Sequence, residues 1–385
     1  MVRRLSALAL AVALPLAASA QSPVPEGAVP ERIASGFQFT EGPVWTDGGL
    51  LFSDIPANTV YRWTESLGAE VFLQPSQKSN GLALDADGRV LLAQHDAQRL
   101  ARLGENGVEV ALADAYDGKS FNSPNDLAVH PDGSIYFTDP TWGLEGRPSE
   151  LGFTGLYRLA PDGTVTLLAA DLNQPNGVVF SPDLATLYVT TSNERTVVAY
   201  DLADGAVSYP RVFARLSGGT PQDAADGMAV DEEGRLYVAG PRGVWVFAPD
   251  GTTLDVVDVP GQTTNVTFGP DRTLYITSGP GVYRLALADA TSAEDPADDG
   301  GLSLTSMYPN PASGTATVTF TSGESRHFTL TLTDVLGRAV RSVDLGVRPQ
   351  GEHSIEVDVD GLASGRYVVR MTDGHRDASR AFIVQ

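Results

Sequence analysis

Six oxygen-bearing side chains stand at matching points of a repeated sequence pattern. Each lies six or seven residues before an acidic residue in a short turn-forming segment, and the six are Glu41, Asn80, Asn125, Asn176, Asp226 and Asn265. Carboxylate and amide oxygens are the ligands that hard cations prefer. Glu41 and Asp226 match the charge of a divalent ion, and Asn125 and Asn176 add neutral oxygens. The pattern predicts a Ca²⁺ site that Mg²⁺ or Mn²⁺ could occupy instead, whereas Zn²⁺ is less expected without His or Cys ligands.

A single asparagine at such a point has a simpler interpretation, because Asn often forms a turn just before a strand. Six residues in register argue against that interpretation, since Ser, Gly and Thr serve in such turns equally well. We therefore favour a ring of ligands around one point.

The turn-forming segments recur along residues 44–278 and indicate which elements position these side chains. Their acidic markers are Asp47, Asp87, Asp132, Asp183, Glu233 and Asp271, at intervals of 40, 45, 51, 50 and 38 residues. Each interval has room for about four short strands, which is the size of a propeller blade. The sequence predicts six blades, with residues 32–39 supplying the outer strand that closes the ring. The first strands of the blades would then converge on the axis and bring the six side chains together.

The composition narrows the possible fold and function classes. The 385 residues include 26 Lys and Arg against 48 Asp and Glu, a formal net charge of −22. This charge repels phosphate backbones and anionic membranes, so no nucleic-acid partner is expected. Hydrophobic residues make up 42%, and 40 Gly with 25 Pro favour many turns and an all-β fold. The absence of cysteine excludes disulfides, thiolate ligands and a cysteine nucleophile.

The first twenty residues have the features of a signal peptide. Arg3 and Arg4 are followed by an apolar stretch over residues 5–16 and an Ala-Ser-Ala cleavage site that ends at Ala20. We expect a signal peptide over residues 1–20 and export from the cytoplasm, with a retained N-terminal anchor as the alternative. No other segment approaches the roughly 18 apolar residues of a membrane span, so no stable transmembrane segment is expected.

Five segments carry a specific family resemblance. They are FTEGPVW (39–45), SNGLALDADGR (79–89), FNSPNDLAVHPDGSIYFTDPTWGL (121–144), QPNGVVFSPD (174–183) and DGMAVDEEGRLYVAG (226–240). Over about residues 30–288 the chain resembles the gluconolactonase, senescence-marker-protein and luciferin-regenerating family. The resemblance implies a six-bladed propeller with one catalytic divalent metal in its central channel. The metal ligands that it implies are Glu41, Asn125, Asn176 and Asp226. Asn80 and Asn265 would then line the substrate pocket or support the ligands from behind.

The resemblance also implies a reaction, because members of this family hydrolyse lactones of sugar acids and some relatives hydrolyse organophosphorus esters. The prediction is a secreted, Ca²⁺-dependent lactonase that acts on a small lactone. One alternative is a phosphotriesterase or arylesterase with the same metal site, and another is a non-catalytic propeller that binds a ligand. The intact set of two carboxylates and matching amides favours an enzyme, since a binding protein could lose ligands freely.

Hydrolysis requires a cation or donors that stabilise the oxyanion and a base that takes a proton from water. Asp126 is the first candidate base because it is adjacent to a predicted ligand, although a structural carboxylate that binds backbone amides fits equally well. His95 is the second candidate, because a neutral imidazole can accept a proton. Its alternative interpretation is an ordinary polar residue at a strand end.

Four further residues have competing interpretations. The resemblance suggests that Asn122 contacts substrate, and a simple turn fits nearly as well. Asp54 and Asp139 each follow their acidic marker by seven residues, which favours a repeated structural role at a strand end. Trp142 could line a pocket, but packing between blades is slightly favoured.

The C-terminal residues form a separate module. An acidic segment rich in helix and strand breakers predicts a linker over 291–301, between a propeller at 27–290 and a domain at 302–385. In this domain, alternating apolar and polar residues predict a small immunoglobulin-like β-sandwich. The four segments with that alternation are 315–322, 328–335, 354–359 and 367–373.

Three motifs in this module resemble the C-terminal sorting domain of type IX secretion cargo. They are MYPNPASG (307–314), DVLGR (334–338) and LASGRYVVRM (362–371). The resemblance implies passage through the periplasm, recognition by the type IX machinery and a secreted or cell-surface location. An ordinary carbohydrate-binding or surface-binding β-sandwich is the alternative.

Overall fold

The computed structural model describes residues 22–104, 107–220, 223–270, 272–288, 302–308, 312, 314–334, 338–363, 365–374 and 376–384. The predicted signal peptide and linker lie outside these residues. The described chain consists of β-strands and one short 3₁₀ helix, η1 (Trp142–Leu144), so the predicted all-β class is confirmed. Within this part of the chain, no helix has the length and apolar character needed to cross a membrane.

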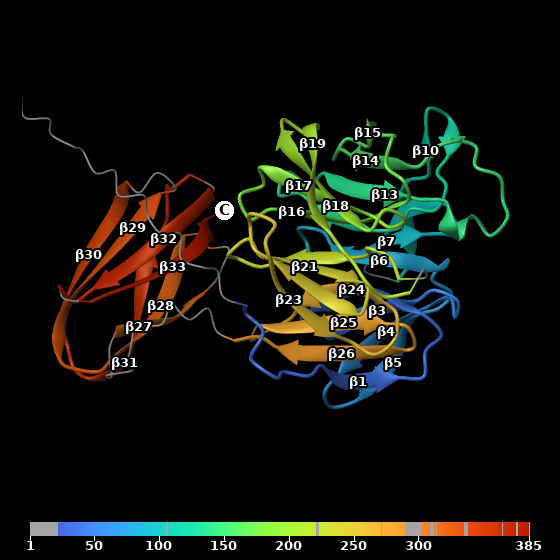
Figure 1. Ribbon diagram of the computed structural model, residues 1–385. Coiled ribbons are helices and arrows are strands. Elements are labelled where there is room, and N and C mark those ends of the chain that lie inside the picture. The colour runs from blue at the N-terminus through green and yellow to red at the C-terminus, as the bar shows by residue number, and fades with distance from the viewer. Residues whose placement is uncertain are drawn as a thin grey trace, which may run out of the picture.

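Six four-stranded antiparallel sheets are formed by residues 31–286 (Figure 1). The first sheet comprises β2 (Thr40–Thr46), β3 (Gly49–Asp54), β4 (Thr59–Thr64) and β5 (Gly68–Leu73). The second comprises β6 (Ser79–Leu84), β7 (Val90–Gln94), β8 (Arg99–Leu103) and β9 (Glu109–Ala113). The third comprises β12 (Leu127–Val129), β13 (Ile135–Asp139), β14 (Gly155–Leu159) and β15 (Val165–Ala169). A short hairpin, β10 (Ala115–Tyr116) and β11 (Lys119–Ser120), precedes the third sheet.

The remaining three sheets repeat this order. The fourth comprises β16 (Pro175–Phe180), β17 (Thr186–Thr191), β18 (Thr196–Ala203) and β19 (Ala206–Arg215). The fifth comprises β20 (Met228–Val230), β21 (Leu236–Gly240), β22 (Gly243–Phe247) and β23 (Thr253–Asp258). The sixth comprises β24 (Thr263–Phe268), β25 (Thr273–Ser278), β26 (Gly281–Ala286) and β1 (Glu31–Ser35).

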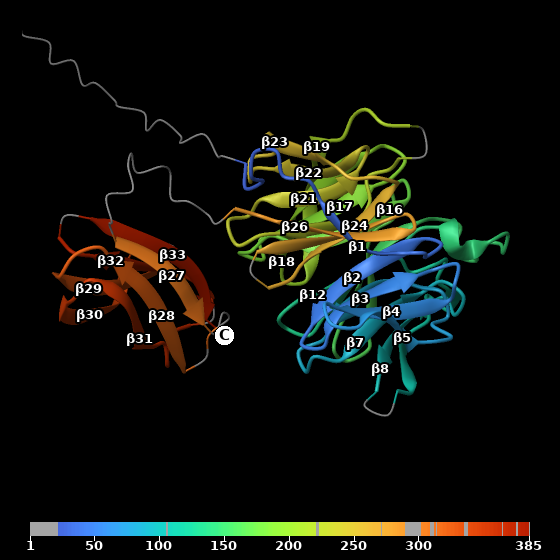
Figure 2. The ribbon, with the colours of Figure 1, turned by 90° about the horizontal axis from the view of Figure 1, so that it is seen from below.

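The first strands of the six sheets contact one another in a closed ring. The ring runs from β2 to β6, β12, β16, β20 and β24, and β24 contacts β2 again. The N-terminal strand β1 pairs with β26, as Figures 1 and 2 show, so the sixth sheet combines the two ends of this region. This pairing confirms the prediction that residues near 32–39 supply an outer strand.

The turns that the repeat predicted are held by aspartate side chains. Asp85 Oδ1 accepts hydrogen bonds from the backbone N–H groups of Asp87 and Arg89, at 3.0 and 2.9 Å. The Arg89 guanidinium then donates to Asp85 Oδ2 at 2.8 Å. Gly88 in this turn has φ +76°, a left-handed conformation that glycine adopts without a steric cost. The Asp-Gly dipeptides in the repeat therefore mark the turns between the first and second strands.

Apolar clusters lie between neighbouring sheets and stabilise the ring by packing these sheets against one another. Leu51, Leu82 and Leu92 pack between the first two sheets, and Leu50 with Tyr275 packs between the first and the sixth. Comparable clusters join the other neighbouring sheets in the described residues. Each fully buried large apolar side chain contributes about 2–3 kcal/mol. These clusters therefore stabilise the ring independently of the polar side chains at its centre.

The C-terminal strands form two sheets that share one apolar core. One sheet has the order β27-β28-β31, with β27 (Leu302–Tyr308), β28 (Thr315–Ser322) and β31 (Gly351–Asp358). The other has the order β30-β29-β32-β33, with β29 (Arg326–Asp334), β30 (Ala339–Arg348), β32 (Gly365–Thr372) and β33 (Asp377–Val384). Phe320 from the first sheet and Phe328 from the second lie in the shared core. The immunoglobulin-like architecture stays a prediction.

Candidate metal and active site

A cavity of about 460 Å³ lies at the end of the ring where the first strands begin. Six of the predicted site residues line it, namely Glu41, Asn80, His95, Asn125, Asn176 and Asp226. All six are buried, and none exposes more than 6% of its surface. The structure therefore brings together the four predicted ligands, one predicted pocket residue and one of the two predicted bases.

Local irregularities at the start of the first strands direct these side chains inward. The strand register shifts after Glu41 in β2, after Ser79 in β6 and after Pro175 in β16. Such bulges change the direction of a side chain and are frequent beside active sites. In the third and fifth sheets, regular pairing begins only at Leu127 and Met228, after the site residue.

Glycines follow four of the six ring residues and let neighbouring sheets approach closely. A Cβ atom on Gly42 would lie 2.1 Å from the carbonyl oxygen of Asn80, and one on Gly227 would lie 1.9 Å from Asn265 Cγ. Gly81 and Gly177 meet the next sheet in the same way. A glycine directly follows four of the six ring residues in the sequence, and the structure shows that these glycines permit the close approach of neighbouring sheets.

Hydroxyl groups from the second strands hold four ring residues by their backbone carbonyls, and one of these is Asn265, whose carbonyl accepts from Thr277 Oγ1 at 3.3 Å. Ser53 Oγ donates to the carbonyl of Asn80 at 2.8 Å, and Thr138 Oγ1 donates to that of Asn176 at 2.6 Å. Thr190 Oγ1 donates to the carbonyl of Asp226 at 2.9 Å. Sequence reasoning missed these anchors. The available signal was a Ser or Thr near the end of four of the six second strands, namely Ser53, Thr138, Thr190 and Thr277.

Glu41 and Asp226, the two predicted carboxylate ligands, are buried, and among the described residues no basic side chain forms an ion pair with either of them. Burial raises the pKa of Asp226 well above its usual value, and the negative charges of Glu41 and Asp126 raise it further. Burial likewise raises the pKa of Glu41, whose Oε2 accepts a hydrogen bond from the Gly42 N–H at 3.0 Å. Asp226 Oδ1 has no hydrogen-bond partner at all. Two buried like charges and an unpartnered oxygen form a site that a cation would stabilise.

Asn80 and His95 occupy another side of the same cavity. Their side-chain atoms Nδ2 and Nε2 are 3.5 Å apart, and Asn80 Oδ1 has no hydrogen-bond partner. Burial lowers the pKa of His95 to about 4; the nearby charge of Glu145 opposes this shift, and the charges of Arg147 and Lys78 add to it. The imidazole is therefore neutral at pH 7 and can accept a proton.

The donor set fits a hard divalent cation. Glu41 and Asp226 supply carboxylates, Asn125 and Asn176 supply amide oxygens, and Asp226 Oδ1 is free to bind. The Asn176 amide is held by a hydrogen bond from Nδ2 to Ser192 Oγ at 3.2 Å. Nowhere in the described residues do three His, Cys, Asp or Glu side chains form a metal cluster, so amides must complete any such site. Oxygen-only coordination of this kind suits Ca²⁺.

Asp126 and Asn265 do not line this cavity. They lie in a second cavity of about 330 Å³, which is formed by later residues of the same first strands. Asp126 is next to Asn125, and consecutive residues of an extended chain point in opposite directions. Burial raises the pKa of Asp126 to about 7, and its Oδ1 accepts a hydrogen bond from the Leu127 N–H. The Asn265 side chain hydrogen-bonds both Glu41 and Asp126, so it supports the carboxylates from behind.

Asn122 also lies outside the cavity. Its backbone N–H donates to Asp139 Oδ2 at 2.8 Å, its Nδ2 donates to the Phe153 carbonyl at 2.9 Å, and its Oδ1 accepts from Ser149 Oγ at 2.5 Å. The side chain is completely buried and its polar atoms are used within the protein. This position does not support the predicted substrate contact, because no polar atom is left to face a ligand.

The structural role predicted for Asp54 and Asp139 is confirmed. Asp54 accepts hydrogen bonds from the consecutive N–H groups of Gln38 and Phe39, and Asp139 accepts from those of Asn122 and Ser123. Both carboxylates lie at the end of a second strand. They fix the segments that lead into neighbouring first strands.

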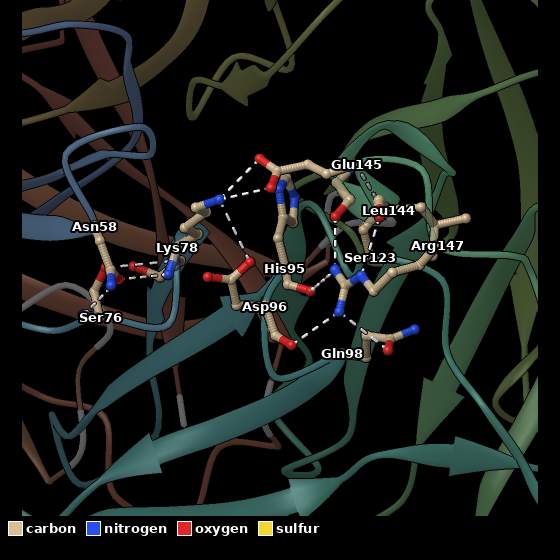
Figure 3. A network of polar contacts seen from close by, with 12 residues as sticks. Asn58, Ser76, Lys78, His95, Asp96, Gln98, Ser123, Leu144, Glu145 and Arg147 are labelled. Atoms are coloured by element: carbon tan, nitrogen blue, oxygen red, sulfur yellow. Dashed lines mark hydrogen bonds and ion pairs between the residues drawn. The ribbon is translucent and has the colours of Figure 1, made fainter.

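Trp142 lies at the cavity and not in the packing between sheets. It exposes 45% of its surface and belongs to η1. The prediction that favoured packing between blades was therefore wrong. The segment around it is held by the polar network that Figure 3 shows, in which Arg147 and Lys78 are the cations.

Two protein families match the chain. Residues 39–280 match the family described as SMP-30/gluconolactonase/LRE-like region. Residues 306–385 match the secretion system C-terminal sorting domain. The two matches fall on either side of the predicted linker.

Known relatives resemble the first of these regions. A gluconolactonase from Zymomonas mobilis is 36% identical over 285 residues, which are 66% of this chain and 80% of that protein. A solved gluconolactonase from Xanthomonas campestris has a TM-score of 0.63 and 33% identity, covering 71% of this chain and 99% of that one. The calcium-binding protein regucalcin from Agrobacterium tumefaciens has a TM-score of 0.58 and 25% identity, over 68% of this chain and 94% of that one. These structures have the propeller fold.

Proposed function

This chain belongs to the SMP-30/gluconolactonase/LRE-like family and carries a C-terminal sorting domain, and from that premise we propose that it is a secreted, divalent-cation-dependent lactonase. Its substrate is a lactone of a sugar acid, as the names of its gluconolactonase relatives suggest. The six sheets are the six blades of one propeller, and the cavity at the start of their first strands is the active site.

One observation carries the proposal more than any other. Asp226, which lines the cavity together with Glu41 and two amide side chains, has a buried oxygen without a hydrogen-bond partner. A buried carboxylate in that state costs free energy unless a cation binds it. An apolar core would serve the fold better at this point, so the arrangement is explained by function.

The residues of the chain have separate tasks in the proposed reaction. Glu41, Asp226, Asn125 and Asn176 hold the cation, and Asn265 keeps Glu41 in place by its side-chain hydrogen bond. A bound Ca²⁺ would polarise the lactone carbonyl, stabilise the oxyanion and make the attacking water more acidic. Asn80 lies beside His95 and orients its imidazole.

His95 is the base that the geometry favours. His95 lines the cavity, whereas Asp126 lines the second cavity. In the proposed step the attacking water replaces Asn80 Nδ2 as the hydrogen-bond partner of His95 Nε2, and Nε2 takes a proton from this water as its oxygen attacks the carbonyl carbon. The ring C–O bond then breaks, and the proton passes to the departing alkoxide. His95 is a weak base because it is buried, so the step also depends on acidification of the water.

The remaining domain assignments follow the same proposal. A signal peptide at 1–20 takes the chain to the periplasm, and residues 27–290 form the catalytic propeller. An acidic linker at 291–301 leads to an immunoglobulin-like sandwich at 302–385, which the type IX machinery recognises. The match of residues 306–385 to a secretion sorting domain supports this part of the proposal.

The experiment that tests the proposed function is lactone hydrolysis by the exported, chelator-treated protein. We expect no enzymatic turnover of glucono-1,5-lactone after chelation and recovery on addition of Ca²⁺, with Mg²⁺, Mn²⁺ and Zn²⁺ assayed separately and spontaneous hydrolysis subtracted. Turnover that survives complete chelation would contradict the metal requirement. Tight Ca²⁺ binding without turnover of any lactone would contradict the lactonase assignment.

A further inference from the structure

Trp142 is a large apolar side chain exposed at the edge of a polar cavity. It exposes 45% of its surface, and among the exposed large hydrophobic residues of the described chain it alone lines this cavity. Exposed apolar surface beside a concave site often marks a contact for a ligand. The rest of the apolar lining includes Phe39, Ile55 and Pro56.

The segment that carries Trp142 is held on its C-terminal side by Arg147 (Figure 3). The guanidinium donates to the carbonyls of Leu144 and Gly143 on its own segment, at 3.0 and 2.8 Å. It also donates to the carbonyls of His95 and Asp96 at 2.9 and 3.0 Å, and to Gln98 Oε1 at 3.2 Å. These bonds use the five N–H donors of an arginine, so the segment is fastened to the end of β7.

An ion pair strengthens the same attachment. Lys78 Nζ lies 2.7 Å from Glu145 Oε2 and 3.6 Å from Asp96 Oδ1. Exposed ion pairs each contribute little to stability, but this pair joins the two sides that Arg147 already bridges. Figure 3 shows both cations reaching across from one segment to the other.

The N-terminal side of the segment is fixed as well. The Thr141 N–H donates to Gln174 Oε1 at 3.0 Å, and Gln174 Nε2 donates back to Thr141 Oγ1 at 2.8 Å. The Gly143 N–H donates to Ser123 Oγ at 3.0 Å. A Cβ on Gly143 would lie 2.4 Å from His95 Cγ, so η1 packs directly on the imidazole. The indole is therefore exposed on a rigid backbone, which lowers the entropy cost of binding a ligand.

We propose that Trp142 stacks on the apolar C–H face of the lactone ring and is a specificity-determining residue, with Arg147 as its positioning residue. The inference rests on the proposed lactonase function. A cyclic sugar lactone has hydroxyl groups around its edge and C–H groups on its faces. Amide and carboxylate side chains in the cavity suit that edge, and a flat indole suits a face.

The test compares Trp142→Ala and Trp142→Phe with wild type. For glucono-1,5-lactone, Trp142→Ala should raise KM about tenfold, equivalent to about 1.4 kcal/mol, and leave kcat within about twofold. Trp142→Phe should keep most of the affinity, and hydrolysis of an acyclic ester should not change. Tyr209→Ala is the matched control, because Tyr209 is an exposed aromatic residue that does not line the cavity.

Arg147→Lys tests the positioning role. It keeps the charge but loses the forked contacts, so KM for the lactone should rise while kcat stays within about twofold, and the melting temperature should fall by a few degrees because hydrogen bonds are lost. A fall in melting temperature with an unchanged KM of the folded enzyme would instead indicate a general loss of stability, which would contradict the positioning role.

Binding of glucono-1,5-lactam, measured by calorimetry, separates this inference from the proposed function. If wild type hydrolyses lactones and Trp142→Ala has the KM of the Tyr209→Ala control, the stacking inference alone is overturned. If wild type hydrolyses no lactone but binds the lactam and Trp142→Ala does not, stacking stands and the proposed function fails. If wild type neither hydrolyses lactones nor binds the lactam, both are overturned.

Discussion

Two aspartates at opposite ends of one short strand have opposite surroundings. Asp226 and Asp231 flank β20, and both are buried, at 4% and 8% exposure. Asp231 accepts hydrogen bonds from two backbone N–H groups, from the Arg235 guanidinium at 2.6 Å and from the Tyr237 hydroxyl at 3.0 Å. At the other end of the strand, Asp226 Oδ1 accepts none. Burial therefore does not tell a structural carboxylate from a functional one, whereas its partners do.

The same contrast separates two regions of the propeller. At the turns between first and second strands, Asp85 and Asp231 stabilise the fold with an arginine of their own turn. At the opposite end of these strands, Glu41 and Asp226 repel each other and have raised pKa values. The turn aspartates stabilise the fold without a ligand, whereas the burial of Glu41 and Asp226 becomes favourable only when a cation binds them.

The largest expected effect comes from Asp226→Asn. The change removes one of the two charges that hold the cation, so Ca²⁺ affinity should fall at least about 100-fold and kcat/KM for the lactone by roughly 10³-fold. In chelator, the variant should melt at the same temperature as wild type or higher, because a buried like-charge repulsion has gone. Calorimetric Ca²⁺ titration and thermal melts check both parts. Unchanged Ca²⁺ affinity would remove Asp226 from the ligand set.

The matched change Asp231→Asn should have the opposite profile. The amide keeps one acceptor for the turn N–H groups but loses the ion pair with Arg235, whose side chain exposes only 12%. We expect the free energy of unfolding to fall by about 2 kcal/mol, with Ca²⁺ affinity and kcat/KM near wild type. Urea denaturation measures the loss. A variant of full stability but low activity would break the contrast between the two aspartates.

The pH dependence of the metal-free protein should sharpen the contrast further. Burial raises the pKa of Asp126 to about 7, and those of Glu41 and Asp226 are also raised. The folded state therefore binds protons more tightly than the unfolded state, and this contribution to stability is lost as pH rises through the folded pKa values. Between pH 6.5 and 8, the melting temperature should fall in chelator and fall less with Ca²⁺.

This pH range also isolates the carboxylates from His95. Burial lowers the pKa of His95 to about 4, so His95 destabilises the fold as pH falls below about 6.5, where the unfolded state takes up its proton. Asp139, whose pKa burial raises to about 7, adds a slope that the cation does not remove. If Ca²⁺ left the slope unchanged in wild type, the cavity carboxylates would not be its ligands.

The sequence predicted the repeat, the all-β class and five of the six ring residues at the cavity because each rests on local patterns. Asp-Gly turns and alternating strands recur at blade length, and the ring residues keep a fixed offset from the turns. The direction in which each side chain points was harder to predict from the sequence. Asp126 and Asn125 are adjacent in sequence but line different cavities, because consecutive residues of an extended chain point in opposite directions.

The role of Asn122 and that of Trp142 could not be predicted for a different reason. Both depend on contacts between distant segments. All polar groups of the Asn122 side chain form hydrogen bonds within the protein, with Asp139, Ser149 and Phe153. Trp142 remains exposed because Arg147 and Gln174 fix the backbone around it. Neither set of partners follows from spacing or composition.

The smallest expected effect concerns the hydroxyl anchors of the ring. Thr190 supports the carbonyl of Asp226, a proposed ligand, and Ser53 supports that of Asn80, which is not one. Thr190→Val and Ser53→Ala should each lower the free energy of unfolding by about 1 kcal/mol, because each removes one buried hydrogen bond.

Ca²⁺ affinity should distinguish the two anchor variants even though their stability losses are similar. Loss of the Thr190 hydroxyl frees the backbone that sets the position of the Asp226 carboxylate, so affinity should fall by about 3- to 10-fold. Ser53→Ala frees only Asn80 and should leave affinity unchanged. Equal losses of affinity in both variants would mean that the ring responds as one unit. In that case the Ser53 hydroxyl, which holds no proposed ligand, would also affect Ca²⁺ affinity. The second strands would then belong to the ligand-dependent centre, and only the parts of the sheets outside them would be stable without a cation.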